Sequence, residues 1–153
     1  MSLGKYLWSE TEDGVYSHIP AGTEAHFDKM DVTVESNYPW DGKVIYHVTG
    51  KTEKETILGI HIPSWVRPGS VQVRINGKVK DITADVEKGY LILKRVWEND
   101  EVELVFPMKI RKIYANLKVR EDAGCVAFMR GPMVYCFEGV DNQGLLQSYH
   151  ILE

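Results

Sequence analysis

Short stretches of alternating apolar and polar residues recur along most of this chain and restrict its fold more than any other feature. In residues 29–35, for example, Met30, Val32 and Val34 alternate with polar side chains. A period of two places the apolar residues on one face of a β-strand. Similar runs occupy residues 15–19, 43–49, 56–62, 71–75, 79–82, 89–95, 101–106 and 109–114. The pattern predicts an all-β protein of about ten short strands.

Turn residues separate these runs. Asp41-Gly42 and Asn76-Gly77 favour hairpins, and Pro63 and Pro107 end the runs that precede them. No segment of helical length shows a period of 3.6 residues, and the best helical candidate is the short stretch 4–9. Short strands at regular spacing favour an antiparallel β-sandwich, jelly-roll-like in arrangement and with little helix.

The triplet Arg130-Gly131-Pro132 joins two further apolar runs and predicts a corner between strands. The chain has two cysteines, Cys125 and Cys136, which are too few for a disulfide scaffold or a zinc site made of cysteines alone. If Arg130-Gly131 formed a two-residue loop, the two cysteines would face each other and could form a disulfide. The alternative is two small buried thiols.

The composition is that of an ordinary globular protein. The 153 residues include 44% hydrophobic residues and carry a net charge of −4, which argues against a nucleic-acid partner. The one dense basic run, 109–112, alternates like the solvent face of a strand. No stretch of eighteen apolar residues indicates a membrane span, and no leader for secretion is recognisable. The sequence does not indicate a cell compartment.

Residues that could carry out chemistry do not form a recognisable site. The five histidines lack the spacing of a metal-binding motif, although His26, His47 and Asp28 could meet across strands. The Gly-x-Ser-x-Gly motif of serine hydrolases does not occur, and Ser64 lies where a turn is expected. The acidic residues cluster in turns, where carboxylates are normally solvated. We therefore assign no catalytic, cofactor-binding or metal-binding residue in this chain.

Aromatic side chains offer the remaining binding hypothesis. Trp40 and Tyr38 lie in a Tyr-Pro-Trp-Asp-Gly turn, and Trp65 follows the end of a strand, so these three residues could contact a carbohydrate ring. The alternative is that large rings of this kind cap the ends of the core, which the pattern favours. Trp97 follows an alternating run and is expected in the core.

Several motifs together resemble one family. The chain contains Tyr38-Pro39-Trp40-Asp41-Gly42-Lys43, then Ile60-His61-Ile62-Pro63-Ser64-Trp65 with His61 where arginine is usual, then Val73-Arg74-Ile75-Asn76-Gly77, Gly89 to Trp97, Glu101 to Met108 and the segment around Arg130-Gly131-Pro132. In this order they resemble glycoside hydrolase family 127, the bacterial β-L-arabinofuranosidases. The resemblance covers about residues 13–142.

The resemblance implies an architecture and a chemistry. Members of the family have an (α/α)6 barrel followed by β-sandwich domains. Their retaining hydrolysis uses a cysteine nucleophile, a glutamic acid/base and a zinc ion held by cysteines and a glutamate on the barrel. Neither Cys125 nor Cys136 matches those positions, so no catalytic role carries over. The resemblance therefore implies a parent glycoside hydrolase whose zinc and active site lie outside this chain.

We expect residues 1–12 to be the end of the helical barrel or a leader, 13–142 a β-sandwich domain and 143–153 a C-terminal tail. The first hypothesis is a non-catalytic accessory domain that packs against the catalytic barrel of its parent. An exposed apolar patch on such a domain could also form a homodimer. The alternative is a carbohydrate-binding module that uses exposed Trp and Tyr side chains.

Overall fold

The computed structural model describes residues 4–116, 118–122, 124–138, 140 and 142. The chain forms two compact units, Met1–Met108 and Lys109–Glu153. We expected a single sandwich over residues 13–142, so the division after Met108 differs from that expectation. Alternating strands occur on both sides of the boundary, and the pattern therefore does not mark it.

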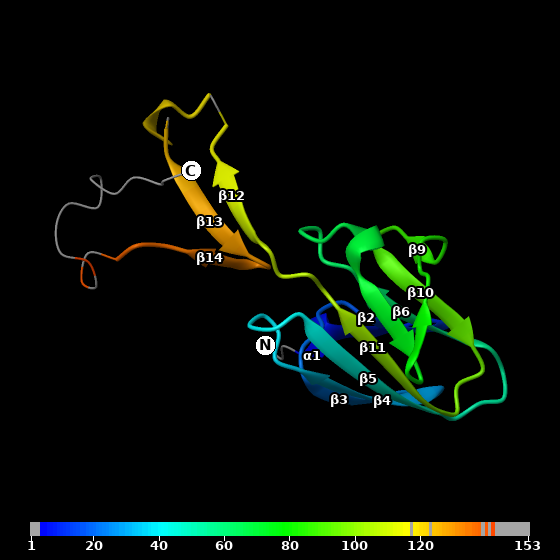
Figure 1. The fold of residues 1–153 in the computed structure, drawn as a ribbon. Coiled ribbons are helices and arrows are strands. Elements are labelled where there is room, and N and C mark those ends of the chain that lie inside the picture. The colour runs from blue at the N-terminus through cyan, green and yellow to red at the C-terminus, as the bar shows by residue number, and fades with distance from the viewer. Residues whose placement is uncertain (1–3, 117, 123, 139, 141, 143–153) are drawn as a thin grey trace. The chain divides into compact units, whose positions relative to one another are not determined.

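The first unit contains a five-stranded sheet, sheet A (Figure 1). Its strands, in spatial order, are β1 (Trp8–Glu10), β2 (Gly14–Ser17), β6 (Thr56–His61), β10 (Tyr90–Arg95) and β9 (Val86–Glu87). The pair β2–β6 is parallel, and the other pairs are antiparallel. A single helical turn, α1 (Gly4–Leu7), precedes β1. The helix expected over residues 4–9 is therefore shorter, because Trp8 already pairs with Ser17.

A six-stranded sheet, sheet B, forms the second layer of this unit. Its strands, in spatial order, are β3 (Thr23–His26), β4 (Met30–Ser36), β5 (Lys43–Gly50), β11 (Asn99–Val105), β7 (Gln72–Ile75) and β8 (Lys78–Lys80). All five pairs are antiparallel. A 3-10 turn, η1 (Pro68–Ser70), precedes β7. No helix among the described residues has the length and apolar character needed to cross a membrane.

One hydrophobic cluster joins the two sheets. Leu58, Ile60 and Leu91 of sheet A and Val44 and Leu104 of sheet B are fully buried in it. This packing confirms the predicted all-β sandwich, with alternate residues of each strand facing the core. The described residues form fourteen strands instead of about ten, because strands of two or three residues such as β1, β8 and β9 are too short to show a period.

A hydrogen bond between hydroxyl groups crosses this core. The Ser17 Oγ and Tyr46 Oη atoms lie 3.0 Å apart, and both residues are buried. Burial raises the pKa of Tyr46 well above its ordinary value. The neutral Tyr46 phenol and the Ser17 hydroxyl satisfy each other by this hydrogen bond, so neither is an unsatisfied polar group between the sheets.

The second unit contains a three-stranded antiparallel sheet, sheet C. Its strands are β12 (Ile110–Tyr114), β13 (Val126–Arg130) and β14 (Met133–Tyr135), and a 3-10 turn, η2 (Arg120–Asp122), lies between β12 and β13. Arg130 pairs with Met133, so the hairpin loop is Gly131-Pro132. Gly131 has a φ of 59°, which suits the first central position of a two-residue hairpin turn.

This register differs from the Arg130-Gly131 loop that would have brought the two cysteines together, and the alternative of two buried thiols is also wrong, because both cysteines are exposed. A loop of Arg130-Gly131 would have placed Cys125 opposite Cys136, but the loop lies one residue further along the chain. Both cysteines are exposed and free. The sequence could not distinguish the two loops, because Gly131 fits either of them.

Candidate functional site

The turn between β4 and β5 carries the first predicted sugar contact, Trp40. The backbone N–H of Trp40 donates to the Asn37 carbonyl over 2.8 Å, and that of Lys43 donates to Asp41 Oδ1 over 3.2 Å. The Tyr38-Pro39 peptide bond is cis. Trp40 is 64% exposed, whereas Tyr38 is half-buried. The turn therefore holds a large indole ring at the surface on a backbone fixed by its own hydrogen bonds.

Trp65 contributes to the core instead. It is half-buried and packs against the core cluster, with its ring centroid 6.3 Å from that of Phe106. The backbone of Gly42 also approaches Phe106 so closely that a Cβ there would lie 2.0 Å from the Phe106 carbonyl oxygen. Trp65 and the turn of Trp40 thus border the same residue. The exposed ring among the three predicted contacts is that of Trp40.

Trp97 is a core residue, as the sequence predicts. It is 3% exposed, and its indole N–H donates to the Thr56 carbonyl over 2.8 Å. The guanidinium of Arg95 lies 5.4 Å from the centroid of its ring. This geometry combines a buried aromatic ring with a cation over its face.

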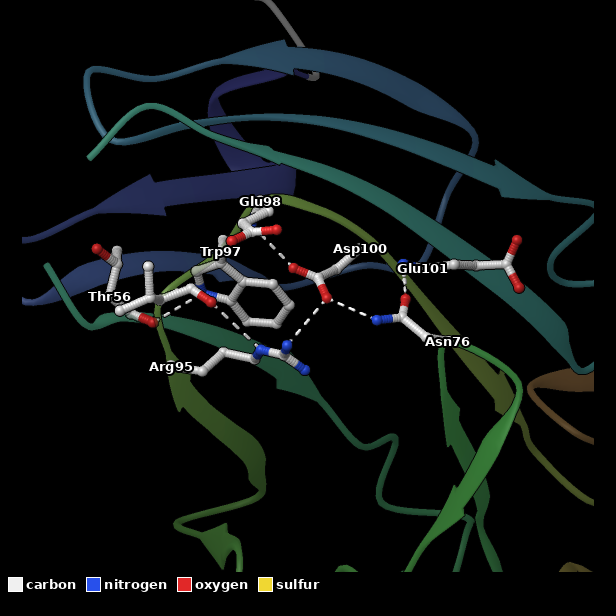
Figure 2. Close-up of polar contacts among 8 residues, drawn as sticks. Thr56, Asn76, Arg95, Trp97, Glu98, Asp100 and Glu101 are labelled. Atoms are coloured by element: carbon white, nitrogen blue, oxygen red, sulfur yellow. Dashed lines mark hydrogen bonds and ion pairs between the residues drawn. The ribbon is translucent and has the colours of Figure 1, made fainter. Parts of the chain in front are cut away.

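A buried carboxylate forms a polar network in the first unit that the sequence pattern did not reveal. Asp100 accepts hydrogen bonds from Arg95 Nη2 (3.0 Å), Asn76 Nδ2 (2.8 Å) and the Glu98 backbone N–H (3.0 Å) (Figure 2). Asn76 Oδ1 in turn accepts from the Glu101 backbone N–H over 2.8 Å. Three donors contact the carboxylate, which makes this network a structural connection between strands.

The sequence did contain a signal for this network. In the run 99–105, the period of two places Asp100 on the same side as Val102 and Leu104, which are both fully buried. An acidic residue at an inward position needs partners, because an unpaired buried charge is costly. Asn76 lies 24 residues before Asp100 and Arg95 lies five residues before it, on other strands, so the pattern could not identify them as partners.

His26 and His47, which could have met across strands with Asp28, contact two different carboxylates. His26 Nδ1 lies 2.8 Å from Asp31 Oδ1, and His47 Nε2 lies 3.2 Å from Glu35 Oε1. Lys51 also binds Asp31 over 2.7 Å, and this ammonium, followed by His26, holds the pKa of the Asp31 carboxyl below its usual range. Within the described ranges, no three His, Cys, Asp or Glu side chains gather in a way that could hold a metal ion.

A second group of side chains lies on the outer face of sheet A and has no counterpart in the sequence analysis. The Tyr90 hydroxyl lies 2.7 Å from His18 Nδ1, and His18 Nε2 lies 2.9 Å from Ser9 Oγ. The ring centroids of Tyr16 and His61 lie 5.8 and 5.2 Å from that of Tyr90. Burial, and next the neighbouring His18, lower the pKa of His61. The group is therefore aromatic and rich in hydroxyl and imidazole groups.

Two hollows lie elsewhere on the first unit. One, of about 500 Å³, runs along β9 and β10 and is lined by Asp85, Glu87 and Lys94 among others. The other, of about 270 Å³, lies beside Asp100 and Asn76. In the first, Lys80 and Asp85 pair over 2.8 Å. Neither hollow contains a nucleophile next to a base.

Comparison with known families reproduces the division into two units. Residues 14–108 match the family model described as the β-L-arabinofuranosidase, GH127 middle domain. Residues 110–153 match the glycoside hydrolase family 127 C-terminal domain. The boundary between the two matches coincides with the division of the structure after Met108.

Individual relatives agree with this assignment. The chain is 37% identical, over 99% of its length, to a non-reducing end β-L-arabinofuranosidase of Bifidobacterium longum subsp. longum, and it spans 24% of that protein. The crystal structure of a GH127 β-L-arabinofuranosidase from Geobacillus stearothermophilus T6 matches with a TM-score of 0.85 and 41% identity, over 95% of this chain and 23% of that one. A second GH127 β-arabinofuranosidase structure matches with a TM-score of 0.79 and 34% identity, over 93% and 25% of the two chains.

The chain thus spans about a quarter of the length of the relatives it matches. The order of motifs from the Tyr38 turn to the Arg130 hairpin follows the two matched domains. This chain belongs to glycoside hydrolase family 127 and comprises sequence of its middle and C-terminal domains.

Proposed function

We propose that this chain is a non-catalytic accessory region of a retaining glycoside hydrolase, and that it packs against the catalytic barrel of the longer protein. The observation that carries the proposal is the composition of sheet C. A sheet with one face in water shows apolar residues on one side only. Sheet C carries them on both sides.

The strand register assigns the residues of sheet C to its two faces, because directly opposed residues share a face. One face carries the apolar and aromatic residues Ile110, Tyr114, Val126, Phe128, Met133 and Tyr135, and the other carries Ile113, Ala127, Met129 and Val134. Ile110 is 71% exposed, and Val134, on the opposite face, is 64% exposed. Each face therefore exposes apolar side chains whose burial against a partner would be favourable in free energy.

The second unit has almost no interior of its own. Gly131 is the one buried residue among those whose burial is described in residues 109–142. Apolar area removed from water contributes about 25 cal/mol per Å². Sheet C is consequently stabilised by a partner, which we take to be the rest of the enzyme. In the isolated chain, a second copy of sheet C is the alternative partner.

Paired measurements on the isolated chain and the full-length enzyme test this proposal. Tyr135→Ser should lower the stability of the full-length enzyme by about 1 to 3 kcal/mol, because it removes a contact with the covering surface. The same change should leave the isolated chain within about 0.5 kcal/mol of wild type. Val79→Ser is a matched control, since Val79 is 78% exposed on the short strand β8 of the first unit. Equal effects of Tyr135→Ser in both contexts would contradict the proposal.

An activity assay tests the non-catalytic part of the proposal. The purified chain should not hydrolyse an aryl β-L-arabinofuranoside, with or without added zinc, whereas the full-length protein should. Within the part of the chain that the structure describes, no three His, Cys, Asp or Glu side chains gather to hold a metal ion. The proposal assigns the zinc of the parent enzyme to the catalytic barrel, and metal analysis of the purified chain should give well under one zinc per molecule. Turnover by the chain alone would refute this assignment.

A second candidate function, carbohydrate binding, is supported by the exposed ring of Trp40. Aromatic rings on rigid turns can stack against sugars. Calorimetric titration with arabinose-containing oligosaccharides should then give heat that disappears in Trp40→Ala. Because Trp65 packs on Phe106, Trp65→Ala should instead lower stability. Absence of heat at millimolar sugar would leave the scaffold function alone.

A further inference from the structure

The two outer faces of the sandwich differ in chemistry. The outer face of sheet B carries ion pairs, such as Lys43 Nζ with Glu103 Oε2 over 2.8 Å and His47 Nε2 with Glu35 Oε1 over 3.2 Å. Paired charges of this kind are typical of a surface in water. The outer face of sheet A carries, besides the ion pair of Lys94 Nζ with Glu55 Oε2 over 3.7 Å, a group of neighbouring rings.

The register of sheet A places four rings close together. Tyr16 lies opposite Gly59, and His61 lies opposite Tyr90, while the alternate residues of these strands are buried in the core. His18 follows the end of β2 and completes the group. The centroid of the Tyr90 ring lies between 5.2 and 5.9 Å from those of Tyr16, His18 and His61. We call these four residues the ring cluster.

Gly59 is required for this arrangement. A Cβ at position 59 would lie 2.2 Å from Cδ1 and 2.6 Å from Cε1 of Tyr16. The Tyr16 ring therefore occupies the space over the Gly59 backbone. The Tyr90 ring stands at 84° to the Tyr16 ring. The ring cluster is fixed in shape by the backbone beneath it, and all four of its members are half-buried, which leaves part of each ring accessible.

The hydrogen bonds of the ring cluster fix the orientation of its polar groups. His18 bridges the Tyr90 hydroxyl and Ser9 Oγ, so each of these two hydroxyl groups has one hydrogen-bond partner among the described residues. A hydroxyl can form up to three hydrogen bonds, which leaves both with capacity for a ligand. No carboxylate or ammonium group takes part in these contacts. The chemistry suits an uncharged ligand with hydroxyl groups and C–H bonds, and suits an ionic ligand poorly.

We propose that the ring cluster of Tyr16, His18, His61 and Tyr90 is a carbohydrate-binding surface, separate from the Trp40 turn. A neutral sugar ring would contact the aromatic faces through its C–H groups and the hydroxyl groups of Tyr90 and Ser9 through its own. The proposal does not depend on the scaffold function, since an accessory domain can bind sugar whether or not it packs on a barrel.

Saturation-transfer NMR with methyl β-L-arabinofuranoside tests this site on the full 153-residue chain. Saturation of the aromatic protons should transfer to the sugar at roughly 10 mM, a concentration suited to millimolar affinity. Tyr16→Ala should weaken binding by about tenfold or more. Tyr90→Phe, which keeps the ring and removes one hydroxyl, should weaken it by about two- to tenfold.

Matched variants keep the outcomes distinct. Val79→Ser and Arg74→Ala should leave the transfer unchanged, because neither residue belongs to the ring cluster or to the Trp40 turn. Tyr90→Phe removes a single oxygen atom from the surface and guards against a failure of Tyr16→Ala to fold. Absence of transfer in the wild-type chain, or transfer lost in Trp40→Ala but kept in Tyr90→Phe, would overturn the proposal. Chemical shifts of the cluster that respond to protein concentration and not to sugar would also overturn it, in favour of a protein partner on this face.

Discussion

Arg95 Nη2 lies 3.0 Å from Asp100 Oδ1, and the carboxylate side chain is only 5% exposed. Arg95 ends β10 of sheet A, whereas Asp100 belongs to β11 of sheet B. Their ion pair therefore ties together the two ends of the connection that passes from one sheet to the other. Asn76, at the hairpin between β7 and β8, and the Glu98 backbone N–H donate to the same carboxylate.

Removing this carboxylate should destabilise the sandwich strongly. Asp100→Ala leaves Arg95, Asn76 and the Glu98 N–H without their acceptor, and because the Arg95 side chain is 39% exposed the loss should be about 1 to 3 kcal/mol. Asp100→Asn should cost less, because it keeps one acceptor oxygen. Urea denaturation of both variants measures the difference, with Glu101→Ala as an exposed neighbouring control. A stability of Asp100→Ala equal to that of the control would show that the network contributes nothing.

The contact between Gly50 and the carbonyl of Trp97 should exclude any side chain at position 50. A Cβ there would lie 1.8 Å from the Trp97 oxygen, and the Gly50 N–H donates to the Glu98 carbonyl over 2.7 Å. Gly50→Ala must displace backbone, and overpacking of this kind costs about 1 to 3 kcal/mol or more. Gly69→Ala is the control, since nothing lies within 4 Å of its Cβ position. Thermal denaturation that ranked Gly69→Ala as the more damaging change would contradict this account.

The parts of the fold that follow from local pattern were predictable. Met30, Val32 and Val34 are 0%, 1% and 4% exposed, as their alternation predicts. The Asn76-Gly77 hairpin forms between β7 and β8, with φ of 50° and 75° at its two loop residues. Both loop residues thus have the positive φ that Asn-Gly hairpins favour.

Features that depend on distant residues were not predictable from pattern. The period of two places Asp100 on the buried side of its strand. Asn76 and Arg95 contact it only because their strands lie nearby in the fold, and no local pattern determines that pairing. The ring cluster was missed for the same reason, because Tyr16, His61 and Tyr90 come from three separate strands. The parallel pairing of β2 with β6 likewise depends on how the whole sheet assembles, and the sequence of neither strand alone predicts it.

The outer face of sheet B should make the protein sensitive to acid. The hydrogen bond from Lys43 holds the pKa of Glu103 below its ordinary value of 4.5, and Lys51 and His26 lower that of Asp31 below 3.8. The unfolded chain then binds these protons more readily than the folded one. The stability they contribute is present above the ordinary pKa values and is lost as pH falls through the lowered ones.

Lys43→Gln tests this sensitivity. It removes the ammonium that lowers the Glu103 pKa, so urea denaturation between about pH 5 and about pH 3 should show a smaller loss of stability than in wild type. Arg74→Gln is a milder comparison, because Arg74 lies 3.9 Å from the same carboxylate. An identical acid dependence in wild type and Lys43→Gln would rule out Glu103 as a contributor.

The titration of His61 should make the stability of the folded chain depend on pH just below neutrality. Burial, and next the neighbouring His18, lower the pKa of His61 below the ordinary 6.5, and the Tyr90 ring packs against the imidazole with a centroid distance of 5.2 Å. The unfolded chain takes up this proton first as pH falls, so stability declines from about pH 6.5 down to the folded value. Urea denaturation should show a smaller decline in His61→Gln, which cannot titrate. An NMR titration of the His61 ring should give a midpoint below 6.5 in the folded chain. A midpoint at or above that value would mean that the ring cluster does not disfavour the imidazolium form.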